Sequence, residues 1–156
     1  METKGQSRPV SLYFLTACLV FLIAGGWAGG LNFIFDPSGA SLAMDPDAIK
    51  NLPVPDYFLP GIFLLVMYGL APILVLIALW TRPKFARLKA LSRRFNEHWS
   101  WLLVLSLCLV LLGWLGLEVV LLGYIAPIQG TLIVFSLIFL GVILLPSIRH
   151  YYREEL

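Results

Sequence analysis

Four aspartates lie close together in a chain that is otherwise very apolar. Asp36, Asp45, Asp47 and Asp56 all fall between two long apolar stretches. Carboxylates grouped in this way are typical of sites for hard cations such as Ca²⁺, which take about six to eight oxygen ligands. Their spacing lacks the regular alternation of a calcium-binding loop. We therefore predict no metal site and expect these acids to have structural roles.

Local sequence supplies those roles. Residues 36–39, DPSG, match a type I turn, with aspartate first, proline second and glycine fourth. Asp45 precedes a proline, as a helix-capping residue does, and Asp47 then falls in the first turn of a short helix. Asp56 is placed to cap the next helix. The predicted turn and caps are Asp36, Pro37, Ser38, Gly39, Asp45 and Asp56.

One acid, Glu118, falls inside an apolar stretch. A charge at the centre of a bilayer costs about 2.5–3.5 kcal/mol on insertion scales, so such a residue is a functional candidate. Helix rise from Trp99 places Glu118 near one boundary of the hydrocarbon layer, level with Asn32 and Gln129. We predict a polar cluster of Glu118 with Asn32, Gln129 or Lys50. It would be either a structural tie or a vestibule for an ion or ligand.

The cysteines and histidines offer little chemistry. Cys18 and Cys108 belong to no C-x-x-C pair, so a thiol–disulfide enzyme lacks its usual apparatus, and we expect them to pack as small buried residues. His98 and His150 lie at the ends of apolar stretches, and haem ligation would need them deeper. We predict no cofactor.

The elements that carry these residues are membrane-like. The 156 residues are 60% hydrophobic and 13% charged, against about a quarter charged in a soluble domain. A span needs about 20 apolar residues, and lipid forces each span to be helical. The first stretch resembles a signal peptide but continues to Phe35, longer than a usual signal core. We predict one transmembrane domain, 1–156, with spans at about 11–34, 57–80, 100–124 and 128–147.

Lysines and arginines are concentrated on one side of these spans. Two precede the first span, six lie within residues 81–98 and two follow the fourth, which accounts for ten of the eleven. Because positive charge in short loops marks the cytoplasmic side, we predict both termini inside. The loop of residues 35–56, with Lys50, is expected outside.

The basic connector, residues 81–98, has apolar residues at steps of three and four. This pattern is typical of an amphipathic helix lying in the membrane interface. Its cations are expected to attract anionic lipids at the cytoplasmic face. Orientation alone accounts for the charge, so we expect no nucleic-acid partner.

Small residues predict where helices approach closely. Gly25 with Gly29, and Gly26 with Gly30, form two overlapping small-xxx-small pairs. They favour a contact within the bundle, with a homo-oligomer seam as the alternative. Pro72, inside the second span, predicts a kink.

Two segments resemble a known group of proteins. DPSGASLAM, residues 36–44, and PDYFLPGIFLL, residues 55–65, resemble the first outer loop and second span of small bacterial four-span membrane proteins. Ala43 stands where the resemblance leads us to expect glycine. The resemblance implies a bacterial inner-membrane protein and carries no activity with it.

The fold class that follows is all-α, an integral membrane four-helix antiparallel bundle with N-in and C-in. For function, the sequence favours a non-catalytic accessory or assembly partner of other membrane components, since the usual catalytic motifs are missing. One alternative is a small oligomeric channel or transporter with a polar outer vestibule at Glu118. The least favoured alternative is a lipid- or quinone-linked membrane enzyme, so assignment as an enzyme stays open.

Overall fold

The computed structural model describes residues 8–45, 47–51, 53–83, 92, 97–122 and 127–153. Within this part of the chain all regular secondary structure is helical, which confirms the predicted all-α fold class. The helices are α1 (Val10–Phe35), α2 (Phe58–Leu64), α3 (Ala71–Thr81), α5 (Trp99–Leu122), α6 (Pro127–Ile143) and α7 (Pro146–Arg153). Shorter elements are η1 (Ala40–Leu42), η2 (Ala48–Asn51) and a π-helical segment, η3 (Leu65–Leu70), which joins α2 to α3.

Among the described residues, three helical segments are long and apolar enough to cross a membrane: Val10–Phe35, Phe58–Thr81 and Trp99–Leu121. A fourth qualifies only when α6 and α7 are taken together, and these meet at an angle of 48°. The sequence predicted a fourth span over 128–147, whereas α6 ends at Ile143. The reason is Pro146, because proline disfavours helical backbone in the residue before it.

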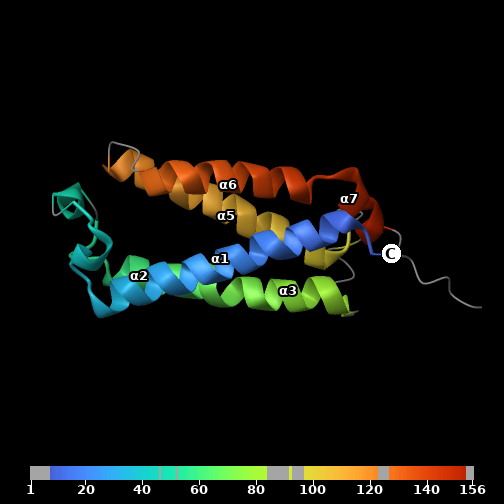
Figure 1. Cartoon of the computed structure of the whole chain (residues 1–156), viewed down its shortest axis with the longest axis horizontal. Coiled ribbons are helices and arrows are strands. Elements are labelled where there is room, and N and C mark those ends of the chain that lie inside the picture. Colours follow the sequence, from blue (N-terminus) through green and yellow to red (C-terminus); the bar gives the residue numbers. More distant parts are fainter. Residues whose placement is uncertain are drawn as a thin grey trace, which may run out of the picture.

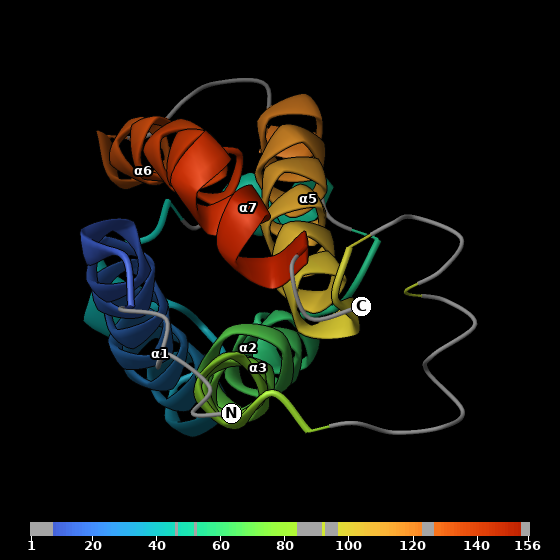
Figure 2. The ribbon, with the colours of Figure 1, turned by 90° about the vertical axis from the view of Figure 1, so that its right-hand side faces the viewer.

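The helices lie side by side along the long axis of the molecule (Figure 1). α1 packs along α2, η3 and α3, α5 packs along α6, and α3 contacts α5 between the two groups. The loop between α1 and α2 lies at one end and α7 at the other (Figure 1). We call these the loop end and the α7 end. Viewed from the α7 end, α7 crosses from α6 toward the start of α5 (Figure 2).

The molecule is apolar both inside and outside. Side chains with no exposed surface include Leu15, Leu19, Val104, Phe139 and Ile143. Large apolar side chains also cover the outer faces of the long helices, among them Phe14, Leu74, Leu109 and Ile138. Exposed apolar surface on this scale marks contact with a membrane or with other proteins.

The second long segment widens at η3, next to Pro72. Proline has no N–H, so the carbonyl of Tyr68 loses its usual helical hydrogen bond. The carbonyl of Gly69 accepts a hydrogen bond from the indole Nε1 of Trp27 at 3.2 Å. The backbone thus accommodates Pro72 with a π-helical segment that is tied to α1.

Two glycines let α1 approach this segment closely. A Cβ atom at Gly26 would lie 2.3 Å from the carbonyl carbon of Tyr68, and one at Gly30 would lie 2.8 Å from the backbone nitrogen of Leu65. Both distances are too short for a real Cβ, and the atoms met are backbone. The Gly26–Gly30 pair therefore forms a helix crossing inside the molecule.

The other small-residue pair is placed differently. A Cβ at Gly25 would meet nothing within 4 Å, and one at Gly29 would meet only a leucine side-chain carbon at an ordinary 3.6 Å. The two pairs have the same sequence pattern but lie on different faces of α1, and only the face with Gly26 and Gly30 contacts the neighbouring helix closely.

The amphipathic helix predicted in the connector 81–98 falls mainly on residues 84–91 and 93–96, which lie outside the described residues.

Candidate functional site

Asp36 organises the turn that follows α1. Its carbonyl accepts the N–H of Gly39 at 3.0 Å, which closes the turn, and Gly39 adopts a left-handed φ of 75°. The Asp36 carboxylate accepts the Ser38 hydroxyl at 2.5 Å and the backbone N–H of Ser41 at 2.7 Å. These bonds, first that from the Ser38 side chain and then that from the Ser41 amide, lower the pKa of Asp36 below its ordinary value.

Acid should loosen this turn. Since the pKa of Asp36 is lower in the folded loop than in an unfolded chain, its ionised form stabilises the loop at pH values above the unfolded pKa of about 3.9. That stabilisation is lost as the pH falls through the folded pKa. We expect hydrogen-exchange protection of the Ser38 and Ser41 amides to be constant from about pH 7 to 5 and to fall below about pH 4. In an Asp36→Asn variant, the protection of these amides should be weaker at pH 7 and should not change as the pH is lowered. Equal pH profiles for the two proteins would contradict this.

Other loop residues also bond locally. The Asp45 carboxylate accepts the backbone N–H of Asp47 at 2.9 Å, and the Asp56 carboxylate accepts that of Phe58, the first residue of α2, at 2.9 Å. Lys50 pairs with Asp47 at 2.5 Å, and both side chains are largely exposed. The backbone at Ala43 is left-handed, with φ 51°, a conformation that glycine adopts more readily.

Glu118 lies at the loop end of α5 and is bonded to α6. The amide Nε2 of Gln129 donates to its Oε2 at 3.1 Å. Asn32 donates instead to the carbonyl of Ala28 in its own helix, at 2.7 Å. Of the four residues expected to cluster, the structure brings Glu118 and Gln129 together, while Asn32 and Lys50 are engaged elsewhere.

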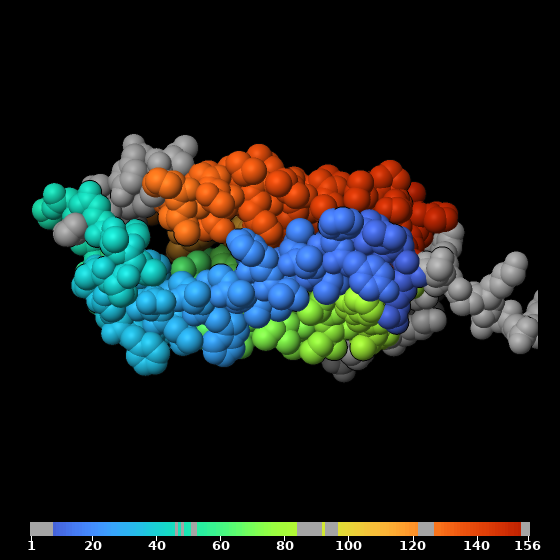
Figure 3. Space-filling view, viewed as in Figure 1, coloured from blue at the N-terminus to red at the C-terminus, as the bar shows by residue number. Residues whose placement is uncertain are grey.

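Aromatic residues that the sequence interpretation missed lie close to Glu118. Trp114, one turn earlier in α5, stacks on Phe63 of α2 with ring centroids 4.2 Å apart, and Phe63 meets Tyr68 edge-on at 5.7 Å. The Tyr68 hydroxyl is buried and has no hydrogen-bond partner among the described residues, whereas the side chain of Trp114 interacts with Glu118. On the surface, a hollow opens between α1 and α6 toward the loop end, with atoms of the α2–α3 segment and α5 behind it (Figure 3).

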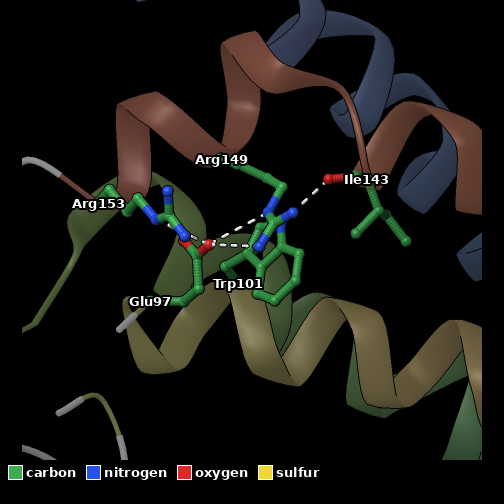
Figure 4. A network of polar contacts seen from close by, with 5 residues as sticks. All are labelled: Glu97, Trp101, Ile143, Arg149 and Arg153. Carbon is green, nitrogen blue, oxygen red and sulfur yellow. Dashed lines mark hydrogen bonds and ion pairs between the residues drawn. The ribbon is translucent and has the colours of Figure 1, made fainter. Parts of the chain in front are cut away.

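A second polar cluster lies at the α7 end (Figure 4). Glu97, two residues before α5, is only 1% exposed. Its Oε1 accepts hydrogen bonds from the Nε and Nη2 of Arg149, at 3.1 and 3.0 Å. The Nε of Arg153 lies 3.3 Å from the same oxygen. We call Glu97, Arg149 and Arg153 the arginine cluster.

Neighbouring side chains join the helices at this end of the molecule. The indole Nε1 of Trp101 donates to the carbonyl of Ile143 at 3.0 Å, where the bend at Pro146 interrupts the helical ladder (Figure 4). The hydroxyl of Tyr152 donates to the carbonyl of Leu79 in α3 at 2.9 Å. α7 therefore links the ends of α3, α5 and α6.

The sequence interpretation treated these arginines as markers of orientation and as part of a basic side that faces anionic lipids, and it did not predict their pairing with Glu97. One signal was available, because Arg149 and Arg153 are four residues apart and so share a helix face. Their acidic partner lies 52 residues earlier than Arg149, and no local pattern connects the two.

His98 and Cys108 make local contacts, and Cys18 packs against the core. The Nδ1 of His98 lies 2.8 Å from the Ser100 hydroxyl at the start of α5, and Cys108 lies buried with its Sγ 3.6 Å from the carbonyl of Ser136. In the part of the chain that the structure describes, no group of three or more His, Cys, Asp or Glu side chains is placed to hold a metal ion.

The described residues define a class: an all-helical protein with three helices, or four if the bent pair is one span, that are long and apolar enough to cross a membrane. Comparison with known proteins finds no matching family, no matching curated protein and no matching solved structure.

Proposed function

We propose that this chain is a multi-pass protein of a bacterial inner membrane, folded as an antiparallel bundle of four spans with both termini in the cytoplasm. Support comes from the apolar outer faces of the helices and from the distribution of charge. Arg149 and Arg153 lie at the α7 end, whereas Asp36 and Asp56 lie at the loop end. This polarity favours the α7 end as the cytoplasmic one.

Its role is that of a non-catalytic accessory or assembly partner of other membrane components. One observation carries this proposal: the interior is filled with apolar side chains along its length, from Leu12 near the α7 end to Leu115 near the loop end. An apolar core of this kind leaves the outer surface of the bundle for binding, and in a bilayer that surface contacts lipid or another membrane protein.

Extraction in discs of a styrene–maleic acid polymer, which keep neighbouring proteins in place, tests this role. We expect discs purified from the native membrane to contain a second membrane protein in a fixed ratio to this chain, whatever its expression level. An unrelated multi-pass protein carrying the same tag is the control. Discs that hold only lipid and this chain would overturn the proposal.

A second function, a small oligomeric channel or transporter, is favoured by the surroundings of Glu118. The Tyr68 hydroxyl, which has no hydrogen-bond partner among the described residues, lies close enough to Glu118 to feel its charge, and Glu118 is bonded to Gln129. A hollow opens at the same end of the molecule (Figure 3). Such a function requires that cation flux into proteoliposomes exceed the leak of empty vesicles. It also requires that Glu118→Gln lower this flux about tenfold or more. Flux equal to that of empty vesicles would eliminate it.

A further inference from the structure

The arginine cluster has more positive than negative charge. The single carboxylate of Glu97 faces the guanidinium groups of Arg149 and Arg153. Its other oxygen, Oε2, is buried and has no partner among the residues described. Because one carboxylate balances only one guanidinium, the described residues of the cluster retain a positive charge that an anion could balance.

The unused hydrogen-bond donors of the cluster are accessible. Arg149 uses its Nε and Nη2 on Glu97, and Arg153 uses its Nε. A guanidinium carries five N–H donors. The Nη1 of Arg149 and both terminal nitrogens of Arg153 therefore have donors that bond to none of the described residues. The two side chains are 42% and 50% exposed, so a ligand can reach them from outside.

Both guanidinium groups are held in place before any ligand arrives. α7 buries Ile148 and Tyr152 against the bundle, which fixes the helix that carries both arginines. The guanidinium of Arg149 also lies 5.4 Å from the ring centroid of Trp101, within cation–π range. A site ordered in advance loses less entropy on binding.

We propose that Arg149 and Arg153 bind the phosphate group of an anionic membrane lipid, with Glu97 as the residue that positions them. The planar fork of arginine matches phosphate oxygens two at a time. The inference rests on the proposed membrane location, because the cluster must then lie at the level of the lipid head groups.

A lipid fits this surface better than free phosphate does. Leu144 and Leu145, directly before α7, are 45% and 40% exposed and lead into the apolar outer face of α6. Acyl chains can lie along that face while the phosphate contacts the arginines. Arg82, whose guanidinium lies 3.4 Å from the ring centroid of Tyr151 in α7, adds a further cation at this end.

Native mass spectrometry of the full chain in mild detergent, titrated with phosphatidylglycerol or phosphatidylcholine, tests the site. The informative variant is Arg149→Lys with Arg153→Lys, which keeps both charges and removes both forks. We expect its affinity for phosphatidylglycerol to fall about tenfold, with that for phosphatidylcholine unchanged. Lys50→Gln removes a cation at the loop end and should change either affinity less than about twofold.

Three results would overturn the proposal. The first is a double variant that binds phosphatidylglycerol as the unaltered protein does, because general charge attraction would then suffice. The second is an equal loss in Lys50→Gln. The third is inorganic phosphate that displaces the lipid and by itself raises the unfolding temperature as much as the lipid does, because the site would then take a free anion.

Two measurements keep the test interpretable. The unfolding temperature of the double variant in phosphatidylcholine should match that of the unaltered protein. If the two temperatures differ, the single variant Arg153→Lys is used instead, and its affinity for phosphatidylglycerol should fall about threefold. A chain that stays dissolved without detergent would instead refute the membrane location itself, so the two failures are distinguishable.

Discussion

Gly26→Ala should destabilise the protein by about 2–3 kcal/mol. The added Cβ would lie 2.3 Å from the carbonyl carbon of Tyr68, so α1 and η3 must move apart along their crossing. Overpacking of this kind typically costs about 1–3 kcal/mol, and here the atom met is backbone and cannot rotate away. The free energy of unfolding, measured by titrating the protein in mixed micelles with a denaturing detergent, checks this.

The neighbouring residue supplies the control. Gly25→Ala adds the same methyl group where nothing lies within 4 Å. Because alanine favours helix over glycine by about 1 kcal/mol, this variant should be as stable as the unaltered protein or slightly more so. Equal effects at Gly25 and Gly26 would contradict the helix crossing described above.

Glu97→Ala should also destabilise the protein, by about 2–3 kcal/mol. It removes the carboxylate on which Arg149 and Arg153 converge, and with it the link between α7 and the start of α5. Breaking a buried ion pair costs about 3–5 kcal/mol, and the partial exposure of both arginines reduces that figure. Unfolding in mixed micelles and hydrogen exchange across α7 should both report the loss.

An exposed ion pair is the matched control for Glu97. Asp47→Ala removes the carboxylate that pairs with Lys50, but those side chains are 77% and 73% exposed. Solvent screens such a pair, so little or no change in stability is expected. A loss as large as that of Glu97→Ala would mean that burial does not set the strength of these pairs.

Local and periodic features could be predicted from the sequence. Long apolar runs predicted helices because lipid and packed cores both require satisfied backbone groups. The order of residues in the DPSG turn predicted the bond between Asp36 and Gly39, which depends only on nearby backbone. Helix rise alone placed Glu118 level with Gln129, and the two side chains are bonded.

Features that depend on which helix faces which could not be predicted. Gly25 and Gly26 are equivalent in sequence, and only the position of η3 separates them. Asn32 was expected near Glu118 from its depth, but depth does not fix the rotation of a helix, and its amide bonds within α1. The partnership of Glu97 with Arg149 depends on the bend before α7, which brings together residues far apart in the chain.

Thiol labelling of intact cells tests the membrane location and orientation most directly. In a background with Cys18→Ala and Cys108→Ala, single cysteines are introduced as Ser41→Cys, in the exposed loop between α1 and α2, and as Ala90→Cys, in the basic connector. A membrane-impermeant maleimide should label the first in intact cells and the second only after the membrane is opened. Labelling of Ala90→Cys in intact cells, or equal labelling of both, would contradict the account.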